Sequence, residues 1–287
     1  MKAALIVEGG GMRGVFASGV LHAFGKLGFD PFDLYFGVSA GACSLASHLA
    51  GQNNRNYEIM ERWSANRRAI NPWRFLRGGH YIDLDWLWDM TIQHDRLDLD
   101  ALFQKAPDFY IVATSLISGK PLYLRPAPDN LEHYLKVSSA LPVFYRGNLS
   151  IGGEPMTDGG VGDAIPVLES WRRGANRMIV VRSRKPGYVK KAGLQDQLMA
   201  WAYRHREGFS AAIRTRADRY NEALRFISDP PPGVQVIDVT PPEDFQTGRT
   251  TTNLEILRQD YERGVAAGYE AARAFSALTD GITTGPE

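Results

Sequence analysis

The sequence predicts a three-layer α/β/α fold built around a mostly parallel central sheet. Two short apolar runs, 3–7 and 34–38, are typical of strands buried on both faces of a sheet. Each run is followed by a glycine-containing turn and then by a helical pattern, over 15–27 and 40–49. Because strand, turn and helix occur twice within the first 50 residues, the pattern indicates parallel strands connected by helices.

The remainder of the chain continues this alternation. Residues 55–105 are mostly helical in pattern and carry four tryptophans, at positions 63, 73, 86 and 88. Apolar runs predict further strands at 109–114, 122–124, 149–151, 177–182 and 234–239, and helical patterns cover 194–226 and 254–278. No internal repeat or linker composition interrupts these elements. We therefore expect residues 1–287 to form a single domain.

Composition excludes several classes of protein. A formal net charge of +1 gives no reason to expect a nucleic-acid partner. The single cysteine, Cys43, cannot form an intramolecular disulfide. The N-terminal apolar run is too short for a signal peptide, and no stretch reaches the ~20 apolar residues that span a bilayer. We therefore expect a cytoplasmic protein whose contact with a membrane is peripheral.

The sharpest local signal is the segment Gly37-Val38-Ser39-Ala40-Gly41, between a predicted strand and a helix of small residues. It matches the G-x-S-x-G nucleophile elbow in the context that this motif requires. The turn is so tight that the residues flanking the serine must be small. The serine stands at the start of the following helix, where free N–H groups favour developing negative charge. The segment predicts Ser39 as a nucleophile.

A glycine-rich loop follows the first predicted strand, and two functions compete for it. Its sequence is Gly9-Gly10-Gly11-Met12-Arg13-Gly14. Gly9, Gly11 and Gly14 satisfy the dinucleotide fingerprint G-x-G-x-x-G, with Asp30 or Asp33 near the offset of a ribose-binding acid. The alternative is an oxyanion hole, in which glycines leave backbone N–H groups free to receive a tetrahedral intermediate.

The position of this loop favours the oxyanion hole. Loops at the carboxyl ends of parallel strands converge on one crevice, so this loop and the elbow are expected to lie side by side. Arg13 fits that interpretation, because a cation reinforces an anion site. A glycine loop beside a nucleophile is the arrangement that acyl transfer requires.

No histidine has the position expected of a catalytic base. The chain has six, His22, His48, His80, His94, His133 and His205. A Ser-His hydrolase would place its histidine in a loop after a late strand, and none follows His205. An aspartate offers another route, because Asp158-Gly159-Gly160 follows a predicted strand and is flanked by glycines that allow close backbone approach.

Taken together, these motifs resemble the patatin-like phospholipase family. The glycine loop, the elbow and Asp158-Gly159-Gly160 occur in the order and spacing of that family, and Ser138-Ser139-Ala140-Leu141-Pro142 resembles a further segment of it. The resemblance covers about residues 3–185. Residues 190–280 are then a helical C-terminal extension that adds nothing diagnostic.

The resemblance implies a Ser-Asp dyad, with Ser39 attacking an ester carbonyl and Asp158 accepting its proton. It assigns the oxyanion hole to Gly10, Gly11, Met12 and Arg13, and it makes Gly9, Gly14, Gly37, Gly41, Gly159 and Gly160 motif glycines. The substrates it implies are phospholipids, lysophospholipids or other acyl lipids. The mechanism needs no metal and no cofactor. The rival functions are a dinucleotide-binding oxidoreductase that uses the glycine loop and a non-catalytic lipid-binding relative.

Two further regions concern the lipid. Residues 182–219 hold ten Lys and Arg against three Asp and Glu, with interleaved aromatics. Such a segment can rest on anionic headgroups, or it can be a solvated face that answers the acidic segment 83–108. The second interpretation is favoured on sequence. The tryptophan-rich stretch 63–88 predicts either a cap over an acyl pocket or core beneath long loops.

Overall fold

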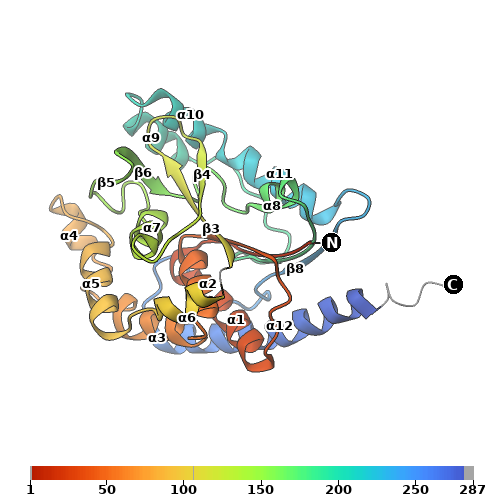
Figure 1. The fold of residues 1–287 in the computed structure, drawn as a ribbon. Helices are drawn as coiled ribbons and strands as arrows, with labels where there is room; N and C mark the ends of the chain where they lie inside the picture. The colour runs from red at the N-terminus through yellow and green to blue at the C-terminus, as the bar shows by residue number, and fades with distance from the viewer. Residues whose placement is uncertain (1, 106, 281–287) are drawn as a thin grey trace.

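A mixed sheet of eight strands forms the centre of the structure, a computed structural model that describes residues 2–105 and 107–280 (Figure 1). The strands are β1 (Lys2–Val7), β2 (Leu34–Val38), β3 (Asp108–Ser115), β4 (Pro121–Leu124), β5 (Leu149–Ile151), β6 (Glu154–Asp158), β7 (Ala175–Val181) and β8 (Gln235–Val239). Their order is β5-β6-β3-β2-β1-β7-β8, and β4 pairs with β3. The central pairs β3-β2, β2-β1, β1-β7 and β7-β8 are parallel, as predicted.

The sheet becomes antiparallel at one edge, where β3 pairs with β4 and β6, and β5 with β6. The strand β6 was not predicted, because its sequence Glu-Pro-Met-Thr-Asp carries no apolar run. It forms a hairpin with β5 through Gly152 and Gly153, which both have positive φ. Its last residue, Asp158, is thereby brought opposite Ala113 of β3.

Helices cover both faces of the sheet, which confirms the three-layer prediction (Figure 1). In chain order they are η1 (Gly11–Gly14), α1 (Val15–Leu27), α2 (Ala40–Leu49), α3 (Arg55–Ile59), η2 (Met60–Ser64), α4 (Pro72–Leu76), α5 (Leu84–His94), α6 (Leu99–Gln104), α7 (Leu131–Ser138), α8 (Val167–Arg172), α9 (Leu194–Ala202), α10 (Glu207–Arg214), α11 (Arg216–Ser228) and α12 (Leu254–Asp280).

The alternation of side chains along β1 creates the two cores. Leu5 and Val7 pack with α1, α2 and α12 on one face, whereas Ala4 and Ile6 pack with α8 and α11 on the other. Figure 1 shows α12 running alongside α1 below the sheet, and α8 and α11 above it. Because β1 is buried on both faces, it is apolar at nearly every position.

The helical stretch predicted over 194–226 consists of three separate helices in the structure. The chain turns after α9 so that α10 folds back against it around Phe209 and Ala200, which are both buried. A straight helix could not bury both residues in one small core. Gly208 permits the return, because a Cβ there would lie 2.6 Å from the carbonyl oxygen of Ile117.

The site lies at the carboxyl ends of the parallel strands. The central strand β1 has β2 on one side and β7 on the other, so the connections leave it in opposite directions. Such a switch in strand order opens a crevice between the loops that follow the strands. The loops after β1, β2 and β7 all line the same cavity, described below.

Candidate active site

Ser39 sits at a strained turn between β2 and α2. Its φ of 53° and ψ of −127° are unusual for a residue with a side chain, and they expose the hydroxyl at the tip of the turn. A Cβ at Gly37 would lie 2.4 Å from Cα of Ala42, and one at Gly41 would lie 2.4 Å from the oxygen of Val7. Both glycines are therefore required by the backbone's close approach, as the elbow motif predicts.

A buried serine holds this turn in place. The amide of Ser39 donates a hydrogen bond of 2.8 Å to Oγ of Ser138, whose hydroxyl in turn donates to the oxygen of Val112 at 2.6 Å. Ser138 thus fastens the elbow to β3 from the end of α7. Sequence reasoning quoted its segment only as part of a resemblance and gave it no role, because a lone serine at a helix end has no signal of its own.

Asp158 is a buried carboxylate with one oxygen left free. The residue is 2 % exposed. Its Oδ1 accepts a hydrogen bond of 2.7 Å from the amide of Gly160, whereas Oδ2 is buried and has no hydrogen-bond partner in the part of the chain described. An unpaired buried acceptor is costly in a folded protein and marks a candidate functional group.

The pKa of Asp158 is raised above its ordinary value, chiefly because burial disfavours the charged form. The Gly160 amide, the Ser39 hydroxyl and two nearby arginines, Arg216 and Arg249, oppose this rise. The Ser39 hydroxyl is thus close enough to act on the carboxyl, although no direct hydrogen bond joins the two side chains among the described residues. Such bonds often tighten only when substrate binds.

Glycines after Asp158 let its loop enter the site. A Cβ at Gly159 would lie 2.2 Å from the oxygen of Val112, so the loop packs directly on β3. The hydroxyl of Thr114 donates to the oxygen of Asp158 at 2.8 Å, and Nε of Arg216 donates to the oxygen of Gly160 at 2.7 Å. The backbone of the loop that carries the carboxylate is therefore held by contacts from both β3 and α11.

The glycine loop after β1 lies against the elbow, as its position predicts. A Cβ at Gly9 would lie 2.8 Å from Cβ of Ser39, and a Cβ at Gly14 would lie 2.9 Å from that of Ala40. Gly10 and Gly11 share one cavity with Ser39. Within the described residues, the amides of these two glycines donate no hydrogen bond to another part of the chain, so they remain available to an oxyanion.

Two of the expected oxyanion-hole residues are engaged elsewhere. The amide of Met12 donates to the oxygen of Arg249 at 3.0 Å, so it is not free to stabilise an oxyanion. The guanidinium of Arg13 donates to the oxygen of Ser183 at 3.1 Å and to its Oγ at 3.4 Å. Arg13 thus joins the glycine loop to the segment after β7, and burial lowers its pKa to about 10.

Two cavities of opposite character meet at Ser39. The first has a volume of about 990 Å³ including its mouth, and α5 and the segment 59–70 supply many of its apolar walls. Trp88 lines it, so one tryptophan of the stretch 63–88 does border an acyl-sized pocket. The second has a volume of about 470 Å³ and contains Asp158 together with five arginine or lysine side chains. Leu141 borders both.

The geometry does not support a dinucleotide site. Asp33 precedes β2, and its Oδ2 accepts from the amide of Ala3 at the start of β1, so it lies at the end of the sheet opposite the glycine loop. Asp30 accepts a hydrogen bond of 2.6 Å from the hydroxyl of Tyr35. Neither acid can reach a nucleotide bound at the glycine loop.

Other chemistries find no support among the described residues. Neither cavity at Ser39 is lined by a histidine. No group of three or more His, Cys, Asp or Glu side chains within residues 2–105 and 107–280 is arranged to hold a metal ion. Cys43 lines the apolar cavity, but burial raises the pKa of its thiol to about 11, which makes it a poor nucleophile.

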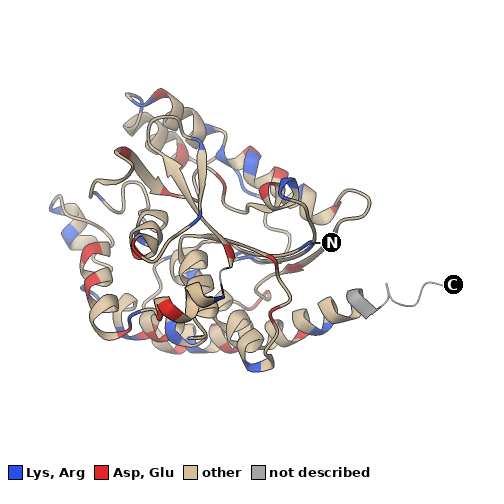
Figure 2. Cartoon of the chain, viewed as in Figure 1, with Lys and Arg blue, Asp and Glu red and all other residues tan. Residues whose placement is uncertain are grey.

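No salt bridge between described residues joins the basic segment 182–219 to the acidic segment 83–108. Among the described residues, the acids at 83, 85, 95 and 108 pair with cations outside 182–219. Arg184, Lys190 and Arg216 instead line the polar cavity, and Arg219 donates to backbone oxygens of Val161 and Gly162. Figure 2 shows the blue positions recurring along α10 and α11, above the sheet.

Comparison with known proteins places the chain in a family. A model of patatin-like phospholipases matches residues 5–171, and a model described as a domain of unknown function (DUF6363) matches residues 207–279. The uncharacterized protein YjjU of Escherichia coli (strain K12) is 33% identical over 284 residues, which are 97% of this chain and 80% of that protein. The crystal structure of VipD from Legionella pneumophila is similar with a TM-score of 0.47 and 13% identity, over 96% of this chain and 67% of that one. The chain belongs to the patatin-like phospholipase family of lipid acyl hydrolases.

Proposed function

We propose that the protein hydrolyses carboxylic esters of acyl lipids through an acyl-enzyme on Ser39, with Asp158 as the base. The observation that carries this proposal is that a serine on a strained elbow shares one cavity with a buried carboxylate that has a free oxygen. A nucleophilic hydroxyl needs a proton acceptor within reach, and Asp158 is the group positioned to supply it.

The chemistry follows in two halves. Oγ of Ser39 attacks the ester carbonyl carbon while Oδ2 of Asp158 accepts its proton. The amides of Gly10 and Gly11 donate to the oxyanion that forms, which collapses to the acyl-enzyme as the alcohol leaves with the proton from Asp158. Water then attacks the acyl-enzyme and gives its proton to Asp158. That proton returns to Ser39 as the fatty acid is released.

The apolar cavity supports an acyl chain as the group transferred to Ser39. Leu84, Leu87 and Ile59 line it, and burying each methylene of a chain there contributes about 0.8 kcal/mol. Ile70, Ile82 and Ile92 line the same cavity, so its walls suit an acyl chain better than a polar group.

The experiment that tests the dyad is hydrolysis of p-nitrophenyl butyrate by wild type, Ser39→Ala and Asp158→Asn. Both variants are expected to lose about 10⁴-fold or more in kcat, since nucleophile and base act as a unit. Two matched controls line neither cavity at Ser39. Ser170→Ala removes another buried hydroxyl, and Asp163→Asn removes another carboxyl whose pKa burial raises.

Both controls should retain activity, and circular dichroism should show that all four variants are folded. Folded Ser39→Ala with wild-type activity would exclude the acyl-enzyme, and folded Asp158→Asn with wild-type activity would exclude the base. An inert wild type would favour the non-catalytic lipid-binding relative.

We extend the proposal to a peripheral contact with a lipid surface through α9. Leu194, Leu198 and Trp201 recur at three-to-four spacing and are all strongly exposed, which is unusual for a surface helix. No described helix is long and apolar enough to cross a membrane. Trp201→Ser with Leu198→Ser should reduce co-sedimentation with phosphatidylglycerol vesicles, whereas unchanged binding would reject α9 as the contact.

A further inference from the structure

The polar cavity beside Ser39 holds an excess of cations that no acid in it neutralises. Its charged lining consists of Arg13, Arg184, Lys190, Arg216 and Arg249 against Glu8 and Asp158. None of the five cations forms a salt bridge with any described residue. Both oxygens of Glu8 are engaged, by the hydroxyl of Tyr220 and the amide of Ser183. Among the described residues that line it, cationic side chains therefore outnumber acidic ones, and the cavity is electropositive.

Burial and mutual repulsion lower the pKa values of two of these cations, Lys190 and Arg249. Burial, followed by repulsion from Arg216, lowers the pKa of Lys190 to about 8. Burial and the same neighbour also lower the pKa of Arg249. Partly buried cations without partners are unfavourable, so a fold keeps them together only where an anion binds or where they hold the backbone. Arg216 holds the oxygen of Gly160, but the ammonium of Lys190 donates no hydrogen bond among the described residues.

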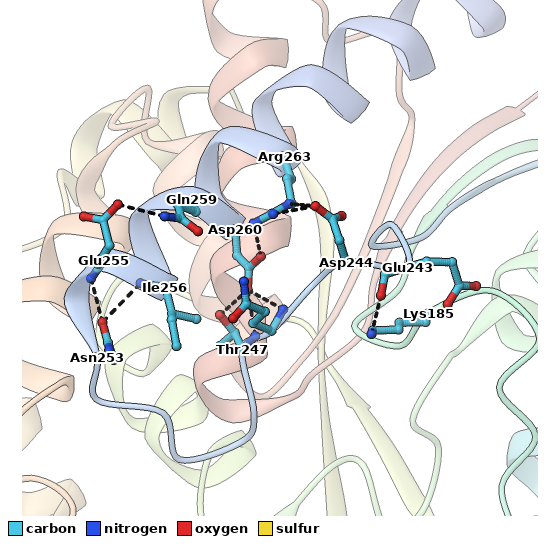
Figure 3. Close-up of polar contacts among 11 residues, drawn as sticks. Lys185, Glu243, Asp244, Thr247, Asn253, Glu255, Ile256, Gln259, Asp260 and Arg263 are labelled. Carbon is cyan, nitrogen blue, oxygen red and sulfur yellow. Dashed lines mark hydrogen bonds and ion pairs between the residues drawn. The ribbon is translucent and has the colours of Figure 1, made fainter.

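Arg249 lies in a loop that hydrogen bonds to the buried carboxylate of Asp260 hold in place. Oδ2 of Asp260 accepts from the amides of Gln246 and Thr247 at 3.0 and 2.7 Å, and from the hydroxyl of Thr247 at 2.6 Å. Its Oδ1 pairs with Arg263 at 2.8 Å (Figure 3). Asp260 is fully buried in α12, so the loop before this helix is held rigidly.

The same loop then reaches the active site. The oxygen of Arg249 accepts the amide of Met12, and a Cβ at Gly11 would lie 2.7 Å from that oxygen. The guanidinium of Arg249 makes no hydrogen bond or salt bridge within the part of the chain described, although Arg249 lines both cavities. A side chain placed so firmly and left unpaired is positioned for a ligand.

We propose that this cavity binds the phosphate of the substrate's headgroup, and that Arg184, Lys190 and Arg249 select acyl lipids whose headgroup carries net negative charge. The inference rests on the proposed function, because the ester must lie at Ser39 between the two cavities. Arginine forks and a lysine ammonium are the side chains that proteins use for phosphate. No carboxylate is left to pair with a choline or ethanolamine cation, since Glu8 is engaged and Asp158 is the base. The substrate class is therefore an anionic glycerophospholipid or lysophospholipid.

The arrangement of the two cavities fits such a substrate. Ser39, Gly11, Leu141 and Arg249 border both cavities, so an ester carbonyl at Ser39 has the apolar cavity on one side and the cations on the other. An acyl glycerophosphate has the same order of groups, with an acyl chain, an ester and a phosphate a few bonds away.

The test compares dihexanoylphosphatidic acid with dihexanoylphosphatidylcholine, both as monomers, and with p-nitrophenyl butyrate. The variant is Arg184→Gln with Lys190→Gln, because neither side chain donates a hydrogen bond to a described residue. The matched control is Lys191→Gln, the exposed neighbour of Lys190 that lines neither cavity. Wild type is expected to prefer the phosphatidic acid. The variant should lose about tenfold or more of kcat/KM on it, mostly through KM, with the chromogenic ester nearly unchanged.

Each alternative outcome is distinct. If wild type cleaves p-nitrophenyl butyrate but shows no preference for phosphatidic acid, or if the variant keeps that preference, the headgroup site is wrong and the esterase stands. If no ester is cleaved, the proposed function fails, and calorimetry with Ser39→Ala still tests the cavity with phosphatidic acid. If inorganic phosphate binds Ser39→Ala as tightly as phosphatidic acid does, the cavity is a site for free phosphate and the headgroup assignment is overturned.

Discussion

The two cavities that meet at Ser39 differ in chemistry and in the part of the chain that forms them. Apart from Arg249, every residue that lines the apolar cavity falls within residues 5–171, the span of the patatin-like match. The polar cavity takes Arg184, Lys190, Arg216 and Arg249 from outside that span. The proposed nucleophile, the proposed base and nearly all of the apolar walls thus lie within the family match, whereas four of the five cations of the polar cavity lie beyond it.

This division has a physical basis. Catalysis requires the elbow, the glycine loop and Asp158 to be held within a fraction of an ångström, and the sheet provides that precision through backbone contacts. Headgroup selection needs only charge at a suitable distance, which side chains from α11 and from loops can supply.

Among variants that leave Ser39 and Asp158 in place, the largest expected effect comes from filling the apolar cavity. Leu87 of α5 lines it, and Leu87→Trp would place an indole in the space that an acyl chain is expected to occupy. We expect kcat/KM for a palmitoyl ester to fall roughly 100-fold, because each methylene excluded from an apolar pocket weakens binding of the transition state. Hydrolysis of p-nitrophenyl butyrate should change by less than about threefold, since a short chain leaves most of the pocket empty.

Leu87→Met, which conserves volume, is the control and should behave as wild type. An equal loss on both esters would mean that the indole has distorted Ser39 rather than shortened the pocket. Retention of palmitoyl ester hydrolysis by a folded Leu87→Trp protein would show that the acyl chain lies elsewhere. Either result would remove the contrast between the two cavities.

A smaller effect is expected at Asp260, a positioning residue that acts through Arg249. In Asp260→Asn, an amide nitrogen replaces an oxygen that accepts hydrogen bonds from the loop or from Arg263, so buried donors lose their acceptor. We expect a loss of about 1–3 kcal/mol in the free energy of unfolding. The ratio of kcat/KM for phosphatidic acid to kcat/KM for p-nitrophenyl butyrate should also fall by about tenfold, through a higher KM for phosphatidic acid.

A purely structural role for Asp260 would reduce stability without changing that preference. Asp244→Asn is the matched control, because Asp244 pairs with the same Arg263 but is exposed (Figure 3). It should leave both the preference and the unfolding transition nearly unchanged. A loss of preference in Asp244→Asn as large as in Asp260→Asn would locate the effect in Arg263 instead of in the loop.

The sequence was sufficient for the fold because the fold depends on strong local patterns. The parallel core follows from apolar runs such as 3–7, and Ser39 follows from a turn that tolerates only small flanking residues. The strand β6 was missed because it lacks an apolar run, although it lies between β5 and β3 in the sheet. The breaks between the three helices of 194–226 were not predicted, since the helical periodicity continues across turns that tertiary packing imposes.

The site was predictable only where a motif requires particular residues. Ser39, Asp158 and the glycines each stand in such a motif, and the structure brings them together. Arg249 has no motif, and its place depends on Asp260, which is close in sequence but acts through a folded loop. The family resemblance assigned Met12 to the oxyanion hole, and no local pattern shows that its amide donates to the oxygen of Arg249, 237 residues away in the chain.

The smallest expected effect is a pH dependence confined to anionic substrates. Lys190, whose pKa burial lowers to about 8, carries its charge below that pH and loses it above. The groups acting on it are Arg184, Asp196, Arg216 and Arg249, with the Tyr220 ring 5.6 Å from its nitrogen. As pH rises through about 8, kcat/KM for phosphatidic acid should fall severalfold, while that for p-nitrophenyl butyrate should not.

Bound phosphate favours the ammonium form of Lys190, so kcat should decline at higher pH than kcat/KM does. Lys190→Gln should abolish the decline, and Lys190→Arg should move it out of range because a guanidinium stays charged. A decline that persists in Lys190→Gln would assign the titration to another group and separate the pH effect from the headgroup site.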